Sequence, residues 1–164
     1  MRQLVLALLA VPLFAAPATE AITVTVPGSL AFTAADAIVP GVSTGNLTGV
    51  TLDKGVGQPI SVALEFRAEP FVQAGVDSIP IFSGGTPYMS VGTVVFTGGN
   101  GTWTTNPGAM VSDPSVTDGG LRQVGVNTAW KGITTVSCTF TQTIPPGKAA
   151  GPYVGAIRTV VVVQ

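Results

Sequence analysis

The sequence predicts an all-β protein, a single antiparallel β-sandwich with an immunoglobulin-like or jelly-roll arrangement of about nine strands. Three observations lead to this prediction. Apolar and polar residues alternate with a period of two along most of the chain. Turn residues, 21 Gly and 13 Pro, separate these stretches at short intervals. No stretch keeps an apolar period of 3.6 residues for more than about two turns.

The segment PISVALEFRAEP is the clearest strand, because every second residue is apolar. Its apolar face is formed by Ile60, Val62, Leu64 and Phe66. The opposite face carries Glu65 and Arg67, which we expect to form a charged, solvent-facing surface with Glu69. Residues 65 and 69 would lie about 13 Å apart on one strand face. That distance is too long for the paired carboxylates of a glycosidase.

Other alternating stretches predict further strands at residues 22–26, 45–53, 91–97, 101–105, 125–130, 134–144 and 153–163. The glycine-rich turn at 98–101 should join the strands on either side of it as a hairpin. Residues 31–39 are nearest to a helical pattern, and Pro40-Gly41 ends it. Residues 106–120 have no clear strand pattern, so we expect a long loop there.

The first 21 residues have the features of a secretory signal peptide. A basic start at Arg2 precedes an apolar run from Leu4 to Ala16, and small residues that suit cleavage after Ala18 or Ala21 follow. We therefore expect residues 1–21 to be a signal peptide and residues 22–164 to form one β-sandwich domain. The protein should be secreted, extracellular or at the cell surface, with no membrane insertion after signal cleavage.

Composition excludes several classes of function. The net charge is −1 and no basic patch occurs, so nucleic acid is not an expected partner. The absence of histidine removes Ser-His-Asp and Cys-His catalysis and most zinc sites. Cys138, the only cysteine, lies in an alternating segment and should be a small core residue. We assign no catalytic, cofactor-binding or metal-binding residue and expect no enzyme and no cofactor.

Two weaker features have alternative interpretations. Asp113 and Asp118 could bring oxygens to a calcium ion, but the regular Asp/Asn ladder of a calcium loop is missing, so we interpret them as turn residues. Trp103 and Trp130 are the candidates for stacking a sugar ring; the alternative is that both fill the core or an interface.

The segment TVVVVQ, residues 159–164, carries four consecutive valines, Val160, Val161, Val162 and Val163. A strand that is apolar on both faces should be covered on both sides. The simpler explanation is a final strand paired between two neighbours in its own sheet. The other is an assembly surface that another subunit completes.

The last third, TFTQTIPPGKAAGPYVGAIRTVVVV, resembles the closing hairpin of bacterial surface β-sandwich families. The similar positions are Ala150, Gly151, Tyr153, Gly155 and Ile157. The first third resembles the opening strands of WxL-type cell-surface domains and of secreted TasA/camelysin-type fibre proteins. The Trp-x-Leu signature is absent, because Trp103 and Trp130 precede Thr-Thr and Lys-Gly. The resemblance therefore does not imply peptidoglycan attachment of the WxL kind.

The resemblance implies a secreted, non-enzymatic structural or cell-surface subunit that self-assembles into fibres by strand exchange. Signal removal would leave Ile22, Val24 and Val26 near a free end, where their strand could add to the sheet edge of the next subunit. Residues 160–163 are the candidate acceptor. The alternative function is an extracellular module that binds carbohydrate or a cell-wall polymer through Trp103 and Trp130.

Overall fold

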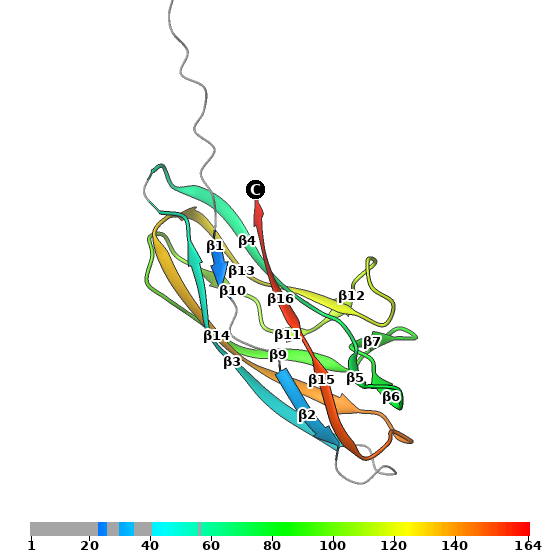
Figure 1. Cartoon of the computed structure of the whole chain (residues 1–164). Coiled ribbons are helices and arrows are strands. Elements are labelled where there is room, and N and C mark those ends of the chain that lie inside the picture. Colours follow the sequence, from blue (N-terminus) through cyan, green and yellow to red (C-terminus); the bar gives the residue numbers. More distant parts are fainter. Residues whose placement is uncertain (1–22, 26–29, 35–40, 56) are drawn as a thin grey trace, which may run out of the picture.

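The computed structural model describes residues 23–25, 30–34, 41–55 and 57–164, with side-chain packing described from Val50 onwards. No helix occurs among these residues, and antiparallel strands make up most of them (Figure 1). The predicted all-β sandwich class is confirmed. The predicted signal peptide, Ile22, Val26 and most of the helix-like segment lie outside the described residues.

The strands form three larger sheets and a small hairpin. The first sheet has the order β1 (Thr23–Thr25), β3 (Gly41–Asp53), β14 (Ile133–Ile144), β9 (Met89–Thr97) and β11 (Gly108–Ala109). The second has the order β10 (Thr104–Thr105), β13 (Gly120–Trp130), β4 (Ile60–Ala68) and β16 (Ile157–Val163), with β12 (Val111–Ser112) also paired to β13. The third has the order β2 (Leu30–Ala34), β15 (Gly151–Gly155), β5 (Phe71–Gln73) and β6 (Asp77–Ile79). The hairpin joins β7 (Phe82–Ser83) to β8 (Thr86–Pro87).

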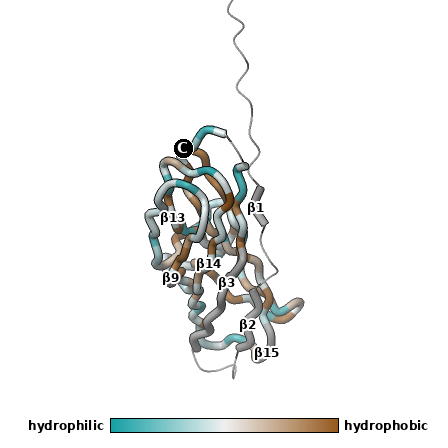
Figure 2. Tube along the Cα trace, turned by 90° about the vertical axis from the view of Figure 1, so that its left-hand side faces the viewer, coloured by the Kyte–Doolittle hydropathy of each residue, from teal (hydrophilic) through white to brown (hydrophobic). Residues whose placement is uncertain are grey.

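The core lies between the first and second sheets and extends to Phe71, Ile79 and Tyr153 of the third sheet. It follows the alternation of apolar and polar residues in the sequence. In β14 every second residue is buried, including Val136, Cys138 and Phe140. The ring of Phe140 packs against Phe66 of β4, with centroids 5.7 Å apart, and so joins the two layers. Figure 2 shows hydrophobic segments on β9 and β14, with hydrophilic segments mainly at the margin of the molecule. Cys138 is a core residue, as predicted.

The predicted final strand, residues 153–163, is divided between two sheets. β15 pairs with β2 and β5, whereas β16 pairs with β4, so the chain changes sheet at Ala156. Gly155 lies directly against the ring of Phe71, where any Cβ would clash. A glycine at this position therefore lets the chain pass over the buried Phe71 and enter the second sheet.

The predicted hairpin at 98–101 is wrong. β10 pairs with β13 of the second sheet, Thr104 opposite Val126, and not with β9. The turn therefore crosses from one layer to the other. Trp103 explains the crossing, because its ring stacks on Phe96 of β9 while the next residues join the second sheet.

Two further predictions, a long loop at residues 106–120 and a helical turn at residues 31–39, also differ from the structure. Residues 106–120 contain the short strands β11 and β12, and Leu30–Ala34 form strand β2 rather than a helical turn. The guanidinium of Arg122 holds the β10–β11 connection by donating to the carbonyl oxygens of Asn106 (3.1 Å), Pro107 (2.8 Å) and Ala109 (3.2 Å). Because β7, β8, β10, β11 and β12 are two-residue strands, the protein has more and shorter strands than the nine expected.

Asp77 joins the third sheet to the turn before β15. Its carboxylate accepts hydrogen bonds from the Ser78 N–H (2.7 Å), the Ala149 N–H (3.0 Å) and Lys148 Nζ (3.0 Å). The buried Tyr153 hydroxyl lies 3.0 Å from Asp77 Oδ2 and 2.9 Å from the Ala149 carbonyl oxygen. The N–H of Ala149, together with Lys148, Ser78 and Tyr153, holds the pKa of Asp77 well below its usual value, although burial opposes this. Burial and the Asp77 carboxylate raise the pKa of Tyr153.

The substitution Asp77→Asn should lower the free energy of unfolding at pH 7 by about 1–3 kcal/mol, because hydrogen bonds to a charged acceptor are lost. The folded-state pKa lies below the unfolded value of about 3.9. This contribution to stability is therefore present above about pH 4 and declines as the pH falls further. Urea unfolding at pH 7, 4 and 3 should show the parent and the variant converging on acidification. Asp118→Asn, at an exposed turn carboxylate, is the control. Equal stability of parent and Asp77→Asn at pH 7 would contradict this role.

Candidate functional site

β16 lies at the edge of the second sheet. Within the described part of the chain it pairs only with β4, from Ile157 opposite Ala68 to Val163 opposite Val62, with no shift in register. Among the described strands, the second neighbour that the simpler explanation expects for β16 is absent. The reason is the change of sheet at Ala156: β13 occupies the other side of β4, and β15 has joined the third sheet.

The two faces of β16 differ in their surroundings. Ile157 is buried and Val161 packs partly against the core, so this face points inward. Arg158, Val160 and Val162 alternate with them on the outer face. Val162 is 37% exposed, and Val163, near the end of the strand, is 60% exposed. The apolar run is therefore only partly covered by its own chain.

For each residue of β16, the direction of its N–H and C=O groups can be assigned, either toward β4 or toward the open side of the strand. The N–H of Gln164 donates to the carbonyl oxygen of Ser61 (2.9 Å), directly opposite in the register. In an antiparallel pair, residues that bond the partner strand alternate with residues whose N–H and C=O point away. Arg158, Val160 and Val162 therefore bond β4, and the groups of Thr159, Val161 and Val163 face the open edge.

The other edge strands in the described residues are shorter. β10, β11 and β12 have two residues each, β1 and β6 have three, and β2 has five, whereas β16 has seven. β3 also has an unpaired side, since β1 pairs with it only at Thr51–Asp53 and β14 is the one described strand paired with Gly41–Val50. Pro107 and Pro114 also interrupt the chain beside the short strands. Short strands and prolines protect sheet edges from further pairing. β16 has neither protection, and it carries no charge after Arg158.

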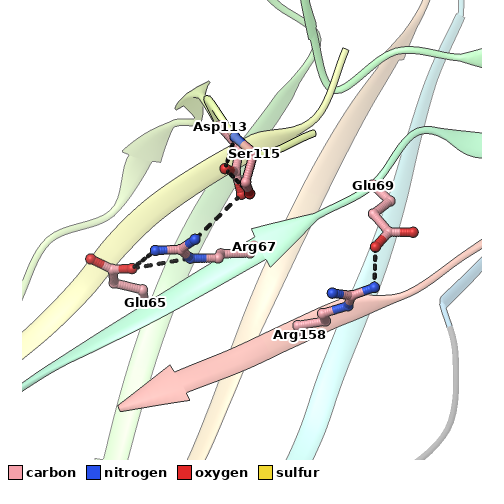
Figure 3. Close-up of polar contacts among 6 residues, drawn as sticks. All are labelled: Glu65, Arg67, Glu69, Asp113, Ser115 and Arg158. Carbon is pink, nitrogen blue, oxygen red and sulfur yellow. Dashed lines mark hydrogen bonds and ion pairs between the residues drawn. The ribbon is translucent and has the colours of Figure 1, made fainter. Parts of the chain in front are cut away.

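A hollow of about 170 Å³ lies on the outer face at the start of β16, lined by Arg67, Glu69, Asp113, Ser115, Arg158 and Val160 among others (Figure 3). Arg67 donates to Glu65 through Nε (3.2 Å) and Nη2 (2.9 Å), and its Nη1 lies 3.8 Å from Asp113. Arg158 forms an ion pair with Glu69. The charged surface predicted around residues 65–69 is therefore a set of ion pairs that reaches from β4 to β16.

Asp113 anchors this set beneath the surface. Its side chain is only 2% exposed, and it accepts hydrogen bonds from the Ser115 N–H (2.9 Å) and the Ser115 hydroxyl (2.6 Å). Burial alone would raise the pKa of Asp113, but the Ser115 hydrogen bonds and the charge of Arg67 outweigh it and lower the pKa. The hydrogen bonds that Arg67 donates to Glu65 raise the pKa of Arg67. Both arginines of the hollow already face carboxylates, so this cluster orders the start of β16.

Asp113 and Asp118, which the sequence indicates as turn residues with calcium binding as the alternative, have different roles in the structure. Asp113 oxygens are engaged by Ser115 and Arg67, whereas Asp118 is an exposed turn residue with a positive φ of 56°. In the described ranges no group of three or more His, Cys, Asp or Glu side chains could hold a metal ion.

The two tryptophans close the sandwich between β9 and β10. Trp130 is fully buried and its Nε1 donates to the Thr134 hydroxyl (2.9 Å), so the expectation that it stacks a ligand is wrong. Trp103 is half-buried; its ring stacks parallel on Phe96 at 4.2 Å, and Trp130 lies tilted against it at 6.2 Å. A Cβ at Gly125 would press on both stacked rings, so the stack depends on that glycine. A groove of about 390 Å³ runs beside Trp103, but Phe96 covers one face of the ring.

Comparison of the chain with family models, curated proteins and solved structures gave no match. Among the described residues, no helix has the length and apolar character needed to cross a membrane. The candidate site therefore rests on the geometry of β16 and its surroundings.

Two proline substitutions test the assignment of the open edge. Val162→Pro removes an N–H that bonds β4 and should lower the free energy of unfolding by about 1–3 kcal/mol, because the carbonyl opposite loses its partner. Val161→Pro removes an N–H that faces the open edge, where proline is tolerated, and should cost clearly less. Urea unfolding of the two variants measures the difference. A Val161→Pro variant as unstable as Val162→Pro would mean that the assignment is reversed or that the edge is covered.

Proposed function

We propose that this protein is a secreted, non-enzymatic structural subunit of the extracellular space or cell surface that assembles into fibres by strand addition at its sheet edges. The observation that carries the proposal is the open edge of β16, seven residues long, regular in register and rich in exposed valine. A long, largely apolar edge is the feature that natural sheets avoid unless another strand covers it.

Strand addition uses the chemistry that this edge offers. The main-chain groups of Thr159, Val161 and Val163 supply hydrogen bonds without regard to sequence, and the side chains beside them supply apolar contact. Such pairing needs no cofactor, metal or charged ligand.

The strand predicted to be the donor, at residues 22–26, lies on the same side of the sandwich as β16. β1, which contains Val24, pairs with β3 from Thr23 opposite Asp53 to Thr25 opposite Thr51, and it also contacts β16. Ile22 and Val26 lie outside the described residues. A strand at residues 22–26 that leaves its own chain would therefore start beside the open edge.

Ion pairing in the hollow supports a structural rather than a catalytic role, because the carboxylates of Glu65, Glu69 and Asp113 are engaged by Arg67 and Arg158. The alternative, binding of a carbohydrate or cell-wall polymer, loses support from the burial of Trp130 and from the covered face of Trp103.

Light scattering of the exported protein over a wide range of concentration, with negative-stain microscopy, tests the proposal. We expect the mass to grow with concentration and filaments to form. Val163→Lys places a charge on the open edge and should reduce assembly at least tenfold, a change equivalent to about 1.4 kcal/mol in the association free energy. Ile133→Lys, at an exposed residue of β14, is the matched control and should assemble like the parent.

Removal of residues 22–26 should stop growth of the mass while circular dichroism still reports a folded β protein. A parent protein that stays monomeric at every concentration would overturn the proposed function. Sedimentation with insoluble cell-wall polysaccharide would then test the alternative.

A further inference from the structure

We propose that β1 guards the assembly edge of its own chain, and that another subunit can add its strand to the whole of β16 only after β1 has left β3. This inference rests on the proposed function, because it states how the same edge is regulated in a single subunit. It gives residues 22–26 two roles. They guard the edge within their own chain, and they are the strand donated to the next subunit.

β1 lies between β3 of the first sheet and β16 of the second. It pairs with β3, with Thr23 opposite Asp53 and Thr25 opposite Thr51, and it also contacts β16. It does not pair with β16, because β4 is the one strand partner of β16 in the described part of the chain. The main-chain groups on the open side of β16 therefore stay unbonded although β1 lies beside them.

The topology places this contact at the valine end of β16. β1 pairs with the last three residues of β3, and residues 54–59 alone separate them from the start of β4. The start of β4 is also where β16 ends, since Val163 lies opposite Val62 and Val162 opposite Ala63. β1 therefore lies near Val162 and Val163, the exposed part of the proposed acceptor.

The spacing of strands shows why β1 has to move. A strand added to β16 would lie about 4.8 Å from it, and a further strand beyond the added one would lie nearly twice as far away, about 9.6 Å. The Cα atoms of β1 and β16 come within 8 Å of each other. No strand fits between them at this distance, so β1 obstructs pairing at the valine end.

β1 can leave without disturbing its neighbours. Its pairing spans three residues, whereas β2, the next strand, is held separately by β15 in the third sheet. The last residues of β3 keep β14 as a partner on their other side. Short pairings at a sheet edge open at low free energy. Opening of β1 is therefore a local step that both exposes the acceptor and frees the donor.

A disulfide lock in the full chain tests this arrangement. Residues 25 and 51 lie directly opposite each other, and such pairs have Cα atoms about 4.5–5.5 Å apart, within the range of a disulfide. In Thr25→Cys/Thr51→Cys, oxidation should join β1 to β3, and reduction should release it. Oxidation should keep the protein monomeric in light scattering, and reduction should restore growth of the mass.

The matched control is Thr97→Cys/Thr135→Cys. These residues lie directly opposite each other in β9 and β14 of the same sheet, and both are exposed. Their disulfide leaves β1 free, so the control should assemble in both redox states. The parent, whose one cysteine is the buried Cys138, gives the background.

A labelled peptide with the sequence of residues 22–28 separates guarding from donation, because the peptide supplies the donor strand itself. In dilute, unassembled protein it should bind the oxidised lock variant about tenfold more weakly than the reduced one, since apparent affinity falls with the fraction of open molecules. Fluorescence anisotropy measures the binding. Adding Val163→Lys should weaken binding to the reduced form, which assigns the peptide to β16 rather than to the vacated side of β3.

The outcomes separate this inference from the proposed function. Loss of both assembly and peptide binding on oxidation, with recovery on reduction, supports the guarding role of β1. Equal peptide binding by the oxidised and reduced forms overturns that role and leaves the proposed function standing, because the edge is then accessible beside β1. Assembly of the oxidised lock variant also overturns it. A parent that stays monomeric, together with a peptide that binds neither form, overturns both proposals.

Discussion

A β-strand has two hydrogen-bonding sides, and the pairing of β16 with β4 occupies only one side of β16. β4 is the centre of the second sheet: Val62, Leu64 and Phe66 are fully buried, and β13 and β16 flank it. The ion pair between Arg158 and Glu69 links the start of β16 to the residue that follows β4. The same pairing that completes the environment of β4 therefore leaves a regular row of main-chain groups and valines at the edge of the sheet.

Elsewhere in the described structure, side chains and short strands close the sandwich. Trp103 and Phe96 stack across the gap between β9 and β10, and Trp130 supports them from the core. Asp77 and Tyr153 tie the third sheet to the turn before β15. Arg122 holds the connection between β10 and β11, and Asp113 anchors the hollow on the outer face. The side of β16 away from β4 has no strand partner among the described residues, and assembly is our proposed explanation for it.

The sequence predicted the fold where the reason for an element is local. The alternation in residues 60–67 and 134–144 depends only on which face meets the core, and both strands appear as predicted. The turn at 98–101 has the same local sequence whether the chain returns to its own sheet or crosses to the other. The packing of Trp103 on Phe96 decides between these, and that packing involves a third element, β13, through Gly125. The same holds at Ala156, where Gly155 passes over Phe71, more than 80 residues earlier in the chain.

The sequence also predicted only part of the candidate site. Four consecutive valines indicated a strand that needs cover on both faces, and the exposure of Val162 and Val163 agrees with that need. The sequence did not indicate that the strand lies at an edge, because strand order depends on contacts between distant segments. The tryptophans were weighed as ligand-stacking or core residues, and only the burial of Trp130 and the stack of Trp103 distinguish these roles.

Amide hydrogen exchange of β16 tests the central claim most directly. In dilute protein, the amides of Val160 and Val162 should be protected by β4, and those of Thr159, Val161 and Val163 should exchange rapidly. As concentration rises and the mass grows, the second set should become protected while the first set changes little. Rapid exchange of Thr159, Val161 and Val163 in the fully assembled protein would contradict the claim that this edge is where one subunit meets the next.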